Sequence, residues 1–248
     1  DENMMTIEQQ HTPEPWSIDF ENELLPELRK ALSKGPFGMM ISHPLVIDPF
    51  FVEDPRSYGL VNAQLRQKQG LLDKARAESD WGQVVFLHER PYRLKALLDY
   101  VLPAKPPKPE LGELLGDTWA DAEAPSHFKS NRGAWCSLFN HLGSSKAYLM
   151  DVDEIGHLGA LPDTLRIYRG YAGRHRTGLS WTLDYDLARW FARRWGSDGA
   201  RVATGTVEKS KVFALLEGRR ESEIVVDPRH VKILKTEQVQ DTIKVVQA

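Results

Sequence analysis

The chain has very little cysteine and no metal-ligand pattern among its histidines. Cys136 is the single cysteine in 248 residues, which excludes an internal disulfide and a zinc site built from several cysteines. The histidines are scattered, and no pair has the His-x-x-x-His spacing of a helical metal site. We therefore expect no bound metal.

The sequence also lacks a long hydrophobic run. No apolar stretch reaches the length that crosses a bilayer, and the N-terminus lacks the charged-then-apolar order of a secretory signal peptide. Hydrophobic residues make up 41% of the chain and charged residues 27%, as in globular proteins. These features predict a cytoplasmic protein with no membrane partner, or an effector delivered by a route that needs no classical signal peptide.

Charge is nearly balanced over the whole chain but not along it. The formal net charge is −3, yet residues 161–248 contain 16 Lys and Arg against 11 Asp and Glu. A basic C-terminal part favours an anionic ligand such as a dinucleotide or a nucleic acid. Ordinary fluctuation between segments explains the asymmetry equally well, so it serves as supporting evidence alone.

The first half of the chain has mainly helical patterns. Hydrophobic spacing predicts helices at 20–32, 58–78, 91–101, 110–118 and 131–142. Pro44 and Pro49 interrupt the apolar stretch 39–51, which predicts packed irregular chain there.

A proline-rich stretch marks the boundary that the sequence predicts between two regions. Four prolines fall between Leu102 and Pro109, and they favour an extended connector. We therefore expect a helical N-terminal region over residues 1–108 and a second domain over residues 109–248.

Strand patterns dominate the last third of the chain. Asp184 is expected to cap a helix that runs to Trp195, while the expected strands cover 165–168, 178–182, 201–208, 211–216, 222–226, 231–235 and 242–246. Helices first and strands later indicate an α+β fold, with a strand core at about 163–248, rather than alternating βαβ units.

Three short motifs in this core bring together groups suited to chemistry on an anionic ligand. Arg169 ends a strand just before a glycine, where a guanidinium can hold a phosphate through two parallel hydrogen bonds. Ser180 and Thr182 alternate, so both hydroxyls are expected on one side of a second strand. Glu221 and Glu223 open an apolar run and are expected on one face of a third strand.

These motifs resemble those of ADP-ribosyltransferases, in the cholera-toxin-like branch that carries an arginine, Ser-x-Thr and Glu-x-Glu. The resemblance also extends to phage, prophage and toxin members with a Gly-x-Ser-Trp-Thr signature, present here as Gly178 to Thr182. It covers about residues 163–248. It implies a split antiparallel β-sandwich with NAD as co-substrate, and no metal.

The resemblance also implies roles for individual residues. Arg169, within Tyr168-Arg169-Gly170, would hold the NAD phosphates, and the Gly170 backbone would bind the nicotinamide amide. Glu223 would stabilise the oxocarbenium-like species as nicotinamide leaves, and Glu221 would orient or deprotonate the acceptor.

The Ser-Trp-Thr motif has a supporting part in this scheme. Ser180 would hold Glu223 in place, and Thr182 would support the strand. Trp181 departs from the family pattern, which usually has threonine there; its indole would line the nicotinamide pocket or pack beneath the sheet.

The expected activity is mono-ADP-ribosylation of a macromolecule, and Glu-x-Glu favours an arginine side chain of a protein as acceptor. Two alternatives to the protein acceptor are a nucleic acid and, in an NAD glycohydrolase, water. A non-catalytic phage-associated binding protein is the alternative from another class. The N-terminal region would recognise the substrate, an antitoxin or a phage component, or would only cover one face of the NAD-binding core.

Overall fold

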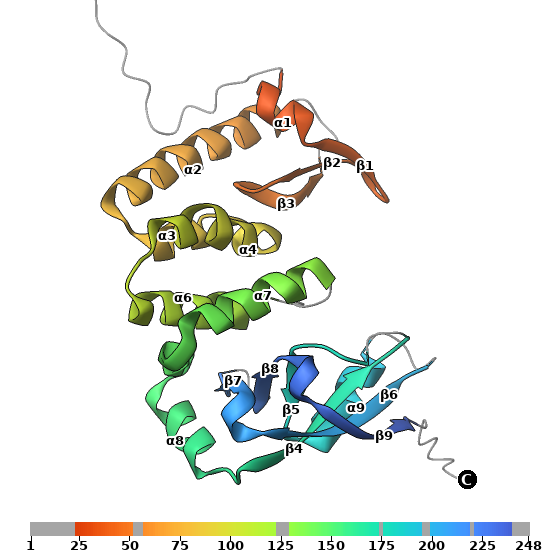
Figure 1. The fold of residues 1–248 in the computed structure, drawn as a ribbon. Coiled ribbons are helices and arrows are strands. Elements are labelled where there is room, and N and C mark those ends of the chain that lie inside the picture. Colours follow the sequence, from red (N-terminus) through yellow and green to blue (C-terminus); the bar gives the residue numbers. More distant parts are fainter. Residues whose placement is uncertain are drawn as a thin grey trace, which may run out of the picture. The chain divides into compact units, whose positions relative to one another are not determined.

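A computed structural model describes residues 23–51, 57–122, 129–173, 176–194, 199–218 and 221–239. The chain divides into two compact units, Asp1–Arg93 and Leu94–Ala248, and each is described by itself (Figure 1). This division falls before the proline-rich stretch at which the sequence analysis places the domain boundary. The expected strand 242–246 lies outside the described residues.

Unit 1 contains a three-stranded antiparallel sheet as well as helices. The strands are β1 (Leu32–Gly35), β2 (Gly38–His43) and β3 (Val46–Phe51), in the order β1-β2-β3. The prediction of irregular chain over 39–51 was therefore wrong. Pro44 falls in the β2–β3 turn, and Pro49 lies in an edge strand where the register shifts, so neither proline has to donate a ladder hydrogen bond.

The helices of unit 1 follow the hydrophobic spacing more closely. They are α1 (Pro26–Lys30), α2 (Tyr58–Glu78), α3 (Trp81–Phe86) and a 3₁₀ turn at Arg90–Tyr92. The helix expected at 20–32 is limited to α1 among the described residues, because the chain continues into β1. Helix α2 agrees with the expected 58–78.

Helical turns occupy the chain where unit 2 begins. They comprise α4 (Arg93–Ala96), a π-helical turn (Leu97–Val101) and α5 (Leu102–Ala104). The expected connector is correspondingly short. Pro103 and Pro109 lie in the first turns of α5 and of α6 (Lys108–Asp121), where the missing N–H of proline has no intrahelical partner to lose.

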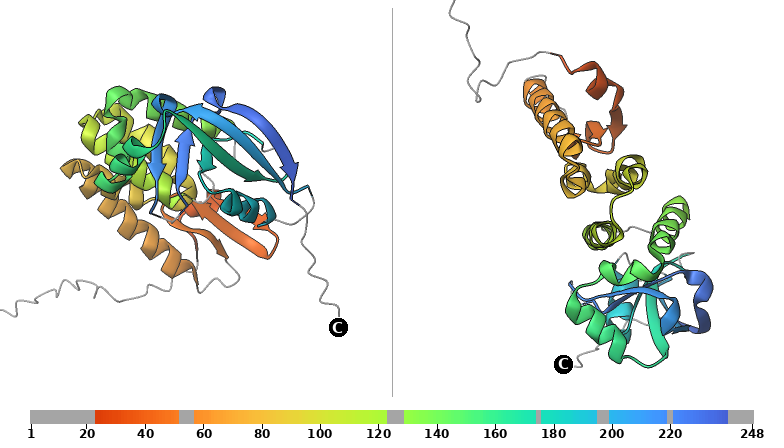
Figure 2. Two further views of the ribbon diagram at one scale, coloured as in Figure 1. Left: turned by 90° about the horizontal axis from the view of Figure 1, so that it is seen from below. Right: turned by 60° about the vertical axis from the view of Figure 1, so that its left-hand side comes forward.

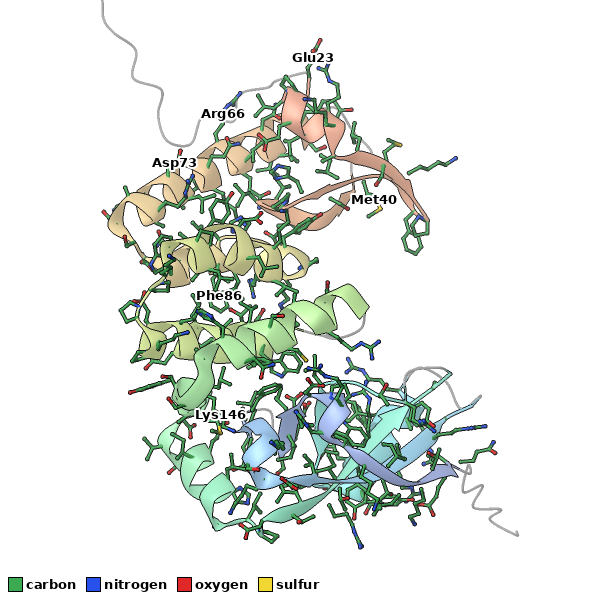
Figure 3. All side chains as sticks on the ribbon, viewed as in Figure 1. Glu23, Met40, Arg66, Asp73, Phe86 and Lys146 are labelled. Carbon is green, nitrogen blue, oxygen red and sulfur yellow. The ribbon has the colours of Figure 1, made fainter. Side chains whose placement is uncertain are left out.

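Helices α6 and α7 (Lys129–Leu142) are followed by a 3₁₀ segment (Gly143–Leu149) and α8 (Val152–Ala160). A Cβ on Gly112 or Gly116 of α6 would lie 2.5 Å from the Tyr148 Cβ or from the Leu149 carbonyl oxygen, respectively. The 3₁₀ segment is anchored again at Lys146 (Figure 3), whose Nζ donates to the carbonyls of Ser210 and Val212. Close packing at glycines thus fixes α6 beside this segment.

The described residues from Thr164 onward form an antiparallel sheet together with an α-helix and two 3₁₀ turns. The strands are β4 (Thr164–Tyr171), β5 (Ser180–Thr182), β6 (Arg201–Glu208), β7 (Val212–Leu216), β8 (Glu223–Val226) and β9 (Lys232–Gln238), and the helix is α9 (Tyr185–Arg193). Figures 1 and 2 show α9 against this sheet. The mixed α and β content with antiparallel strands agrees with the predicted α+β class.

The specific split sandwich of the prediction is not confirmed by the connectivity of this sheet. The described strands form one six-stranded sheet in the order β7-β8-β5-β4-β6-β9 rather than two stacked sheets. The short β5 joins β4 at one register pair, Tyr168 with Thr182, whereas β4 pairs with β6 along its whole length. The two halves, β7-β8-β5 and β4-β6-β9, therefore meet at a narrow junction.

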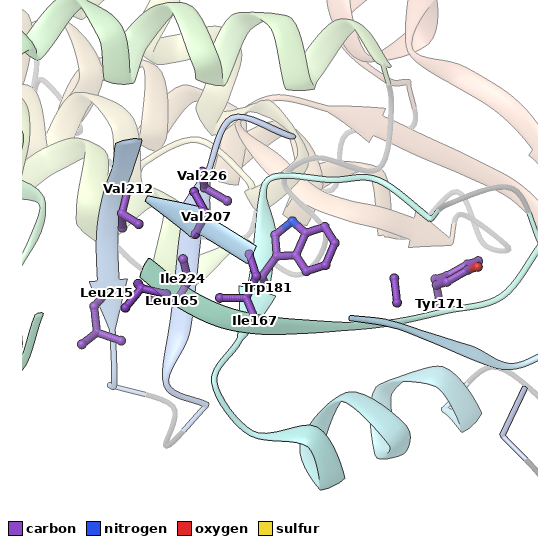
Figure 4. Close-up of a cluster of buried hydrophobic side chains, with 10 residues drawn as sticks. Leu165, Ile167, Tyr171, Trp181, Val207, Val212, Leu215, Ile224 and Val226 are labelled. Carbon is purple, nitrogen blue, oxygen red and sulfur yellow. The ribbon is translucent and has the colours of Figure 1, made fainter. Parts of the chain in front are cut away.

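The core of unit 2 lies on the face of the sheet that carries Trp181 (Figure 4). Trp181 is 2% exposed and belongs to a cluster with buried residues from four other strands, among them Ile167, Ala203, Leu215 and Ile224. A smaller cluster around Ala188 and Ala192 of α9 covers part of the other face. No helix in the described parts of the chain is long and apolar enough to cross a membrane.

Candidate functional site

Arg169 lies at the junction between the two halves of the sheet. Its Nη1 donates a hydrogen bond of 2.5 Å to the carbonyl of Ser180 on β5, across the gap that follows the single β4–β5 pair. A Cβ on Gly178 would lie 2.6 Å from the Arg169 Cζ. The guanidinium thus rests against the glycine backbone, and Gly178 is required for that contact.

The surroundings of Arg169 destabilise the positive charge of its guanidinium. Burial lowers the Arg169 pKa to about 10, while Glu223 opposes that change and the charge of Arg132 adds to it. Arg169 still carries its proton at neutral pH. A charged guanidinium that is partly withdrawn from water favours an anionic ligand, because the ligand replaces the lost solvation.

Glu223 is the first residue of β8 and pairs with Thr182 of β5. Its Oε1 accepts a hydrogen bond of 3.3 Å from the Trp119 Nε1 of α6. Trp119 is 1% exposed, and its ring packs edge-on against Trp135, with centroids 5.2 Å apart. A rigid aromatic cluster on α6 and α7 therefore orients the donor that contacts the Glu223 carboxylate.

Glu221 does not share a strand face with Glu223. The expected strand starts at residue 222, but β8 starts at Glu223, and Ser222 has a left-handed backbone with φ of 41°. The turn at Ser222 breaks the two-residue alternation on which the prediction rested. The Glu221 backbone is held by Thr182, whose Oγ1 donates 2.7 Å to the Glu221 carbonyl and accepts from the Asp184 N–H.

Ser180 and Trp181 have different surroundings from each other. The Ser180 carbonyl accepts a hydrogen bond from Arg169. Trp181 packs beneath the sheet, and its Nε1 donates 2.9 Å to the carbonyl of Gly178. The indole thus fixes the loop that supports the Arg169 guanidinium.

Gly170 and Tyr168 are engaged by the protein itself. A Cβ on Gly170 would lie 1.9 Å from the Ala188 carbonyl oxygen, so the absence of a side chain lets α9 approach β4. The Tyr168 ring makes an edge contact with Tyr185 of α9, with centroids 5.3 Å apart. Tyr168 lines an open depression whose lining does not include Arg169 or Glu223.

Two residues near this site were not predicted from the sequence. Arg132 on α7 donates 3.0 Å from Nη1 to the carbonyl of Thr177, next to Gly178, and its buried Nε has no hydrogen-bond partner in the described structure. Trp119 lies 104 residues from its partner Glu223. No local pattern predicts either contact, because both depend on how α6 and α7 pack against the sheet.

The arrangement combines two guanidinium groups with one carboxylate held by an indole. Such a set can bind a phosphate-containing ligand and place a negative charge beside a developing cation. The described residues contain no group of three or more His, Cys, Asp or Glu side chains that would hold a metal ion. Comparisons with protein-family models, curated proteins and solved structures gave no match to this chain.

Proposed function

We propose that the protein is an NAD-dependent mono-ADP-ribosyltransferase that cleaves the nicotinamide–ribose bond. One observation carries the proposal: strand β5 brings the two groups to the same junction, because Arg169 donates to its Ser180 carbonyl and Glu223 pairs with its Thr182. The motif resemblance supplies the reaction. The fixed carboxylate and the partly desolvated guanidinium support it.

In this proposal Arg169 binds the pyrophosphate of NAD and holds the nicotinamide ribose near Glu223. The bond between ribose C1′ and the nicotinamide nitrogen breaks, nicotinamide leaves with the electron pair, and positive charge develops on the ribose. The Glu223 carboxylate stabilises that charge, as carboxylates do in glycoside cleavage. The acceptor then attacks C1′ and loses a proton, and Glu221 is the candidate base.

The preferred acceptor is an arginine side chain of a protein, as the Glu-x-Glu pattern suggests. Nucleic acid, or water in a glycohydrolase, are alternatives that leave the cleavage step unchanged. The half-exposed Glu221 is compatible with a large acceptor, because its backbone is anchored while no hydrogen bond holds its carboxylate within the described residues.

Release of nicotinamide from NAD tests the cleavage step. Glu223→Gln keeps the size and hydrogen bonding of the side chain but removes its charge, and we expect nicotinamide release to fall by about 10²–10³-fold. Glu208→Gln, on an exposed strand end of the same sheet, is the matched control. Equal release by the parent protein and Glu223→Gln would exclude this mechanism.

Labelling with NAD that carries a radioactive adenylate identifies the acceptor. Label in a cell lysate that is removed by protease and survives nuclease supports the protein acceptor. Label that is removed by nuclease alone would replace it with nucleic acid, and free ADP-ribose without labelled macromolecule would indicate a glycohydrolase. Absence of nicotinamide release under all these conditions would favour a binding protein.

A further inference from the structure

An open depression lies on the face of β4, β6 and β9 that does not carry Trp181. It has a volume of about 430 Å³ and is lined by residues of these strands together with Tyr185, which begins α9. The lining consists of Arg166, Tyr168, Tyr185, Thr204, Leu234, Lys235 and Glu237. Its size is within the range of small-molecule sites, and its lining mixes aromatic, cationic and hydroxyl groups.

Aromatic and apolar groups form one part of the depression. Tyr168 and Tyr185 meet edge to face, with an interplanar angle of 79°, and Tyr185 is 36% exposed. Leu234 on β9 is 49% exposed. Exposed aromatic rings beside an apolar side chain provide a surface on which any nucleic-acid base can stack, whichever base it is.

Cationic side chains flank these rings on the same face. The register aligns Tyr168 with Thr204 and Lys235, and residues directly opposite one another share a face of the sheet. The next row, two residues along β4, aligns Arg166 with Thr206 and Lys232. Arg166, Lys232 and Lys235 thus form a group of three cations around the depression.

The carboxylate that lines the depression is Glu237. Glu237 lies 2.9 Å from the Lys235 Nζ, and both side chains are largely exposed. An exposed ion pair of this kind contributes little, so Lys235 can exchange Glu237 for a phosphate at small cost. The register places a second carboxylate, Glu208, one row beyond Arg166. Three cations therefore face two carboxylates, and the remaining net positive charge is complementary to a phosphate backbone.

The floor of the depression contains a buried hydroxyl. Thr204 is 3% exposed, and its Oγ1 has no hydrogen-bond partner in the described structure. A buried hydroxyl is normally paired, so this one is suited to a polar group of a ligand. It would contact the edge or sugar of a nucleotide whose base stacks on Tyr185.

We propose that this face binds single-stranded nucleic acid, with one nucleotide seated in the depression. A strand fits better than a free nucleotide, because Lys232 continues the cationic group beyond the residues that line the depression. The inference does not depend on the proposed NAD chemistry, since neither Arg169 nor Glu223 lines this site.

Fluorescence anisotropy with labelled oligo-uridine and oligo-thymidine strands of about ten nucleotides tests the proposal. We expect binding that weakens steeply as salt concentration rises. The double variant Arg166→Gln/Lys235→Gln should weaken it by at least about tenfold, and Tyr185→Leu by a similar factor. The matched control, Lys74→Gln/Arg76→Gln on exposed α2, removes the same charge and should leave affinity unchanged.

A second arm uses free uridine monophosphate as competitor. Competition that needs a concentration far above that of the oligonucleotide supports the strand. Competition by uridine monophosphate at the same concentration as the oligonucleotide would overturn the strand proposal in favour of a site for free nucleotides. Oligonucleotide binding that is unchanged in the double variant would show that the strand does not bind at this depression. Nicotinamide release is measured on the same proteins. If the parent protein releases no nicotinamide but binds the oligonucleotide, and the double variant binds it more weakly, the NAD proposal is rejected and the nucleic-acid proposal stands.

Discussion

Gly178→Ala is the sharpest test of how the Arg169 guanidinium is held. The added Cβ would lie 2.6 Å from both Cζ and Nη2 of Arg169, whereas ordinary contacts begin at 3.4 Å. The guanidinium would therefore have to move by about 0.8 Å. Gly178 does not have a left-handed backbone, so alanine is tolerated at its φ and the effect acts through this one contact.

The displacement has a defined consequence for the neighbouring hydrogen bond. Moving the guanidinium disrupts the 2.5 Å bond from Arg169 to the Ser180 carbonyl. A bond to a charged group contributes about 1.5–3 kcal/mol, so we expect a loss of stability in that range. If NAD binds at Arg169, kcat/KM for nicotinamide release should fall by about 10–100-fold, because about 1.4 kcal/mol corresponds to each factor of ten.

Urea denaturation and nicotinamide release are measured on the same preparations. Gly133→Ala on α7 is the matched control, because a Cβ there meets nothing within 4 Å and alanine favours helix. We expect Gly133→Ala to keep or raise stability and to leave nicotinamide release unchanged. A Gly178→Ala protein with parental stability and parental kcat/KM would refute the reasoning.

Three further predictions concern the surroundings of the site. Gly170→Ala should lower the free energy of unfolding by about 3 kcal/mol in urea denaturation, because the new Cβ would lie 1.9 Å from the Ala188 carbonyl oxygen and backbone has to move. Trp119→Phe removes the N–H that contacts Glu223, and we expect nicotinamide release to be about tenfold slower. Thermal unfolding checks that the variant folds. Unchanged nicotinamide release would show that Trp119 is not part of the site. Burial raises the Cys136 pKa to about 11. The folded state thus favours the neutral thiol, so the free energy of unfolding falls as pH rises from the ordinary thiol pKa near 9.0 to about 11. Alkylation of Cys136 by iodoacetamide at pH 8.5 should be much slower in the folded protein than in the urea-unfolded protein. Equal alkylation rates would contradict the burial of this thiol.

The elements that the sequence predicts well are those with local signals. Helix α9 follows the expected pattern because Asp184 accepts hydrogen bonds from the backbone N–H groups of Asp186 and Leu187. Helix α2 is long and periodic, and its bounds agree with the expected 58–78. In both, the information needed for the prediction lies within a few residues.

The features that the sequence does not predict depend on tertiary context. Pro49 is compatible with β3 because that strand is at a sheet edge, which no local pattern reveals. Glu221 leaves the strand because Ser222 adopts a left-handed backbone, for which serine gives no signal. The contact of Trp119 with Glu223 depends on packing across a large sequence separation.

The junction between β4 and β5 also sets the mechanical behaviour of the sheet. Each half is braced by its own ladders, but register joins the described halves through the pair Tyr168 with Thr182. Arg169 belongs to one half and Glu223 to the other, so a small hinge rotation about this pair changes the spacing between guanidinium and carboxylate. A ligand that contacts both Arg169 and Glu223 would therefore link the two halves of the sheet beside the single backbone pair that joins β4 to β5.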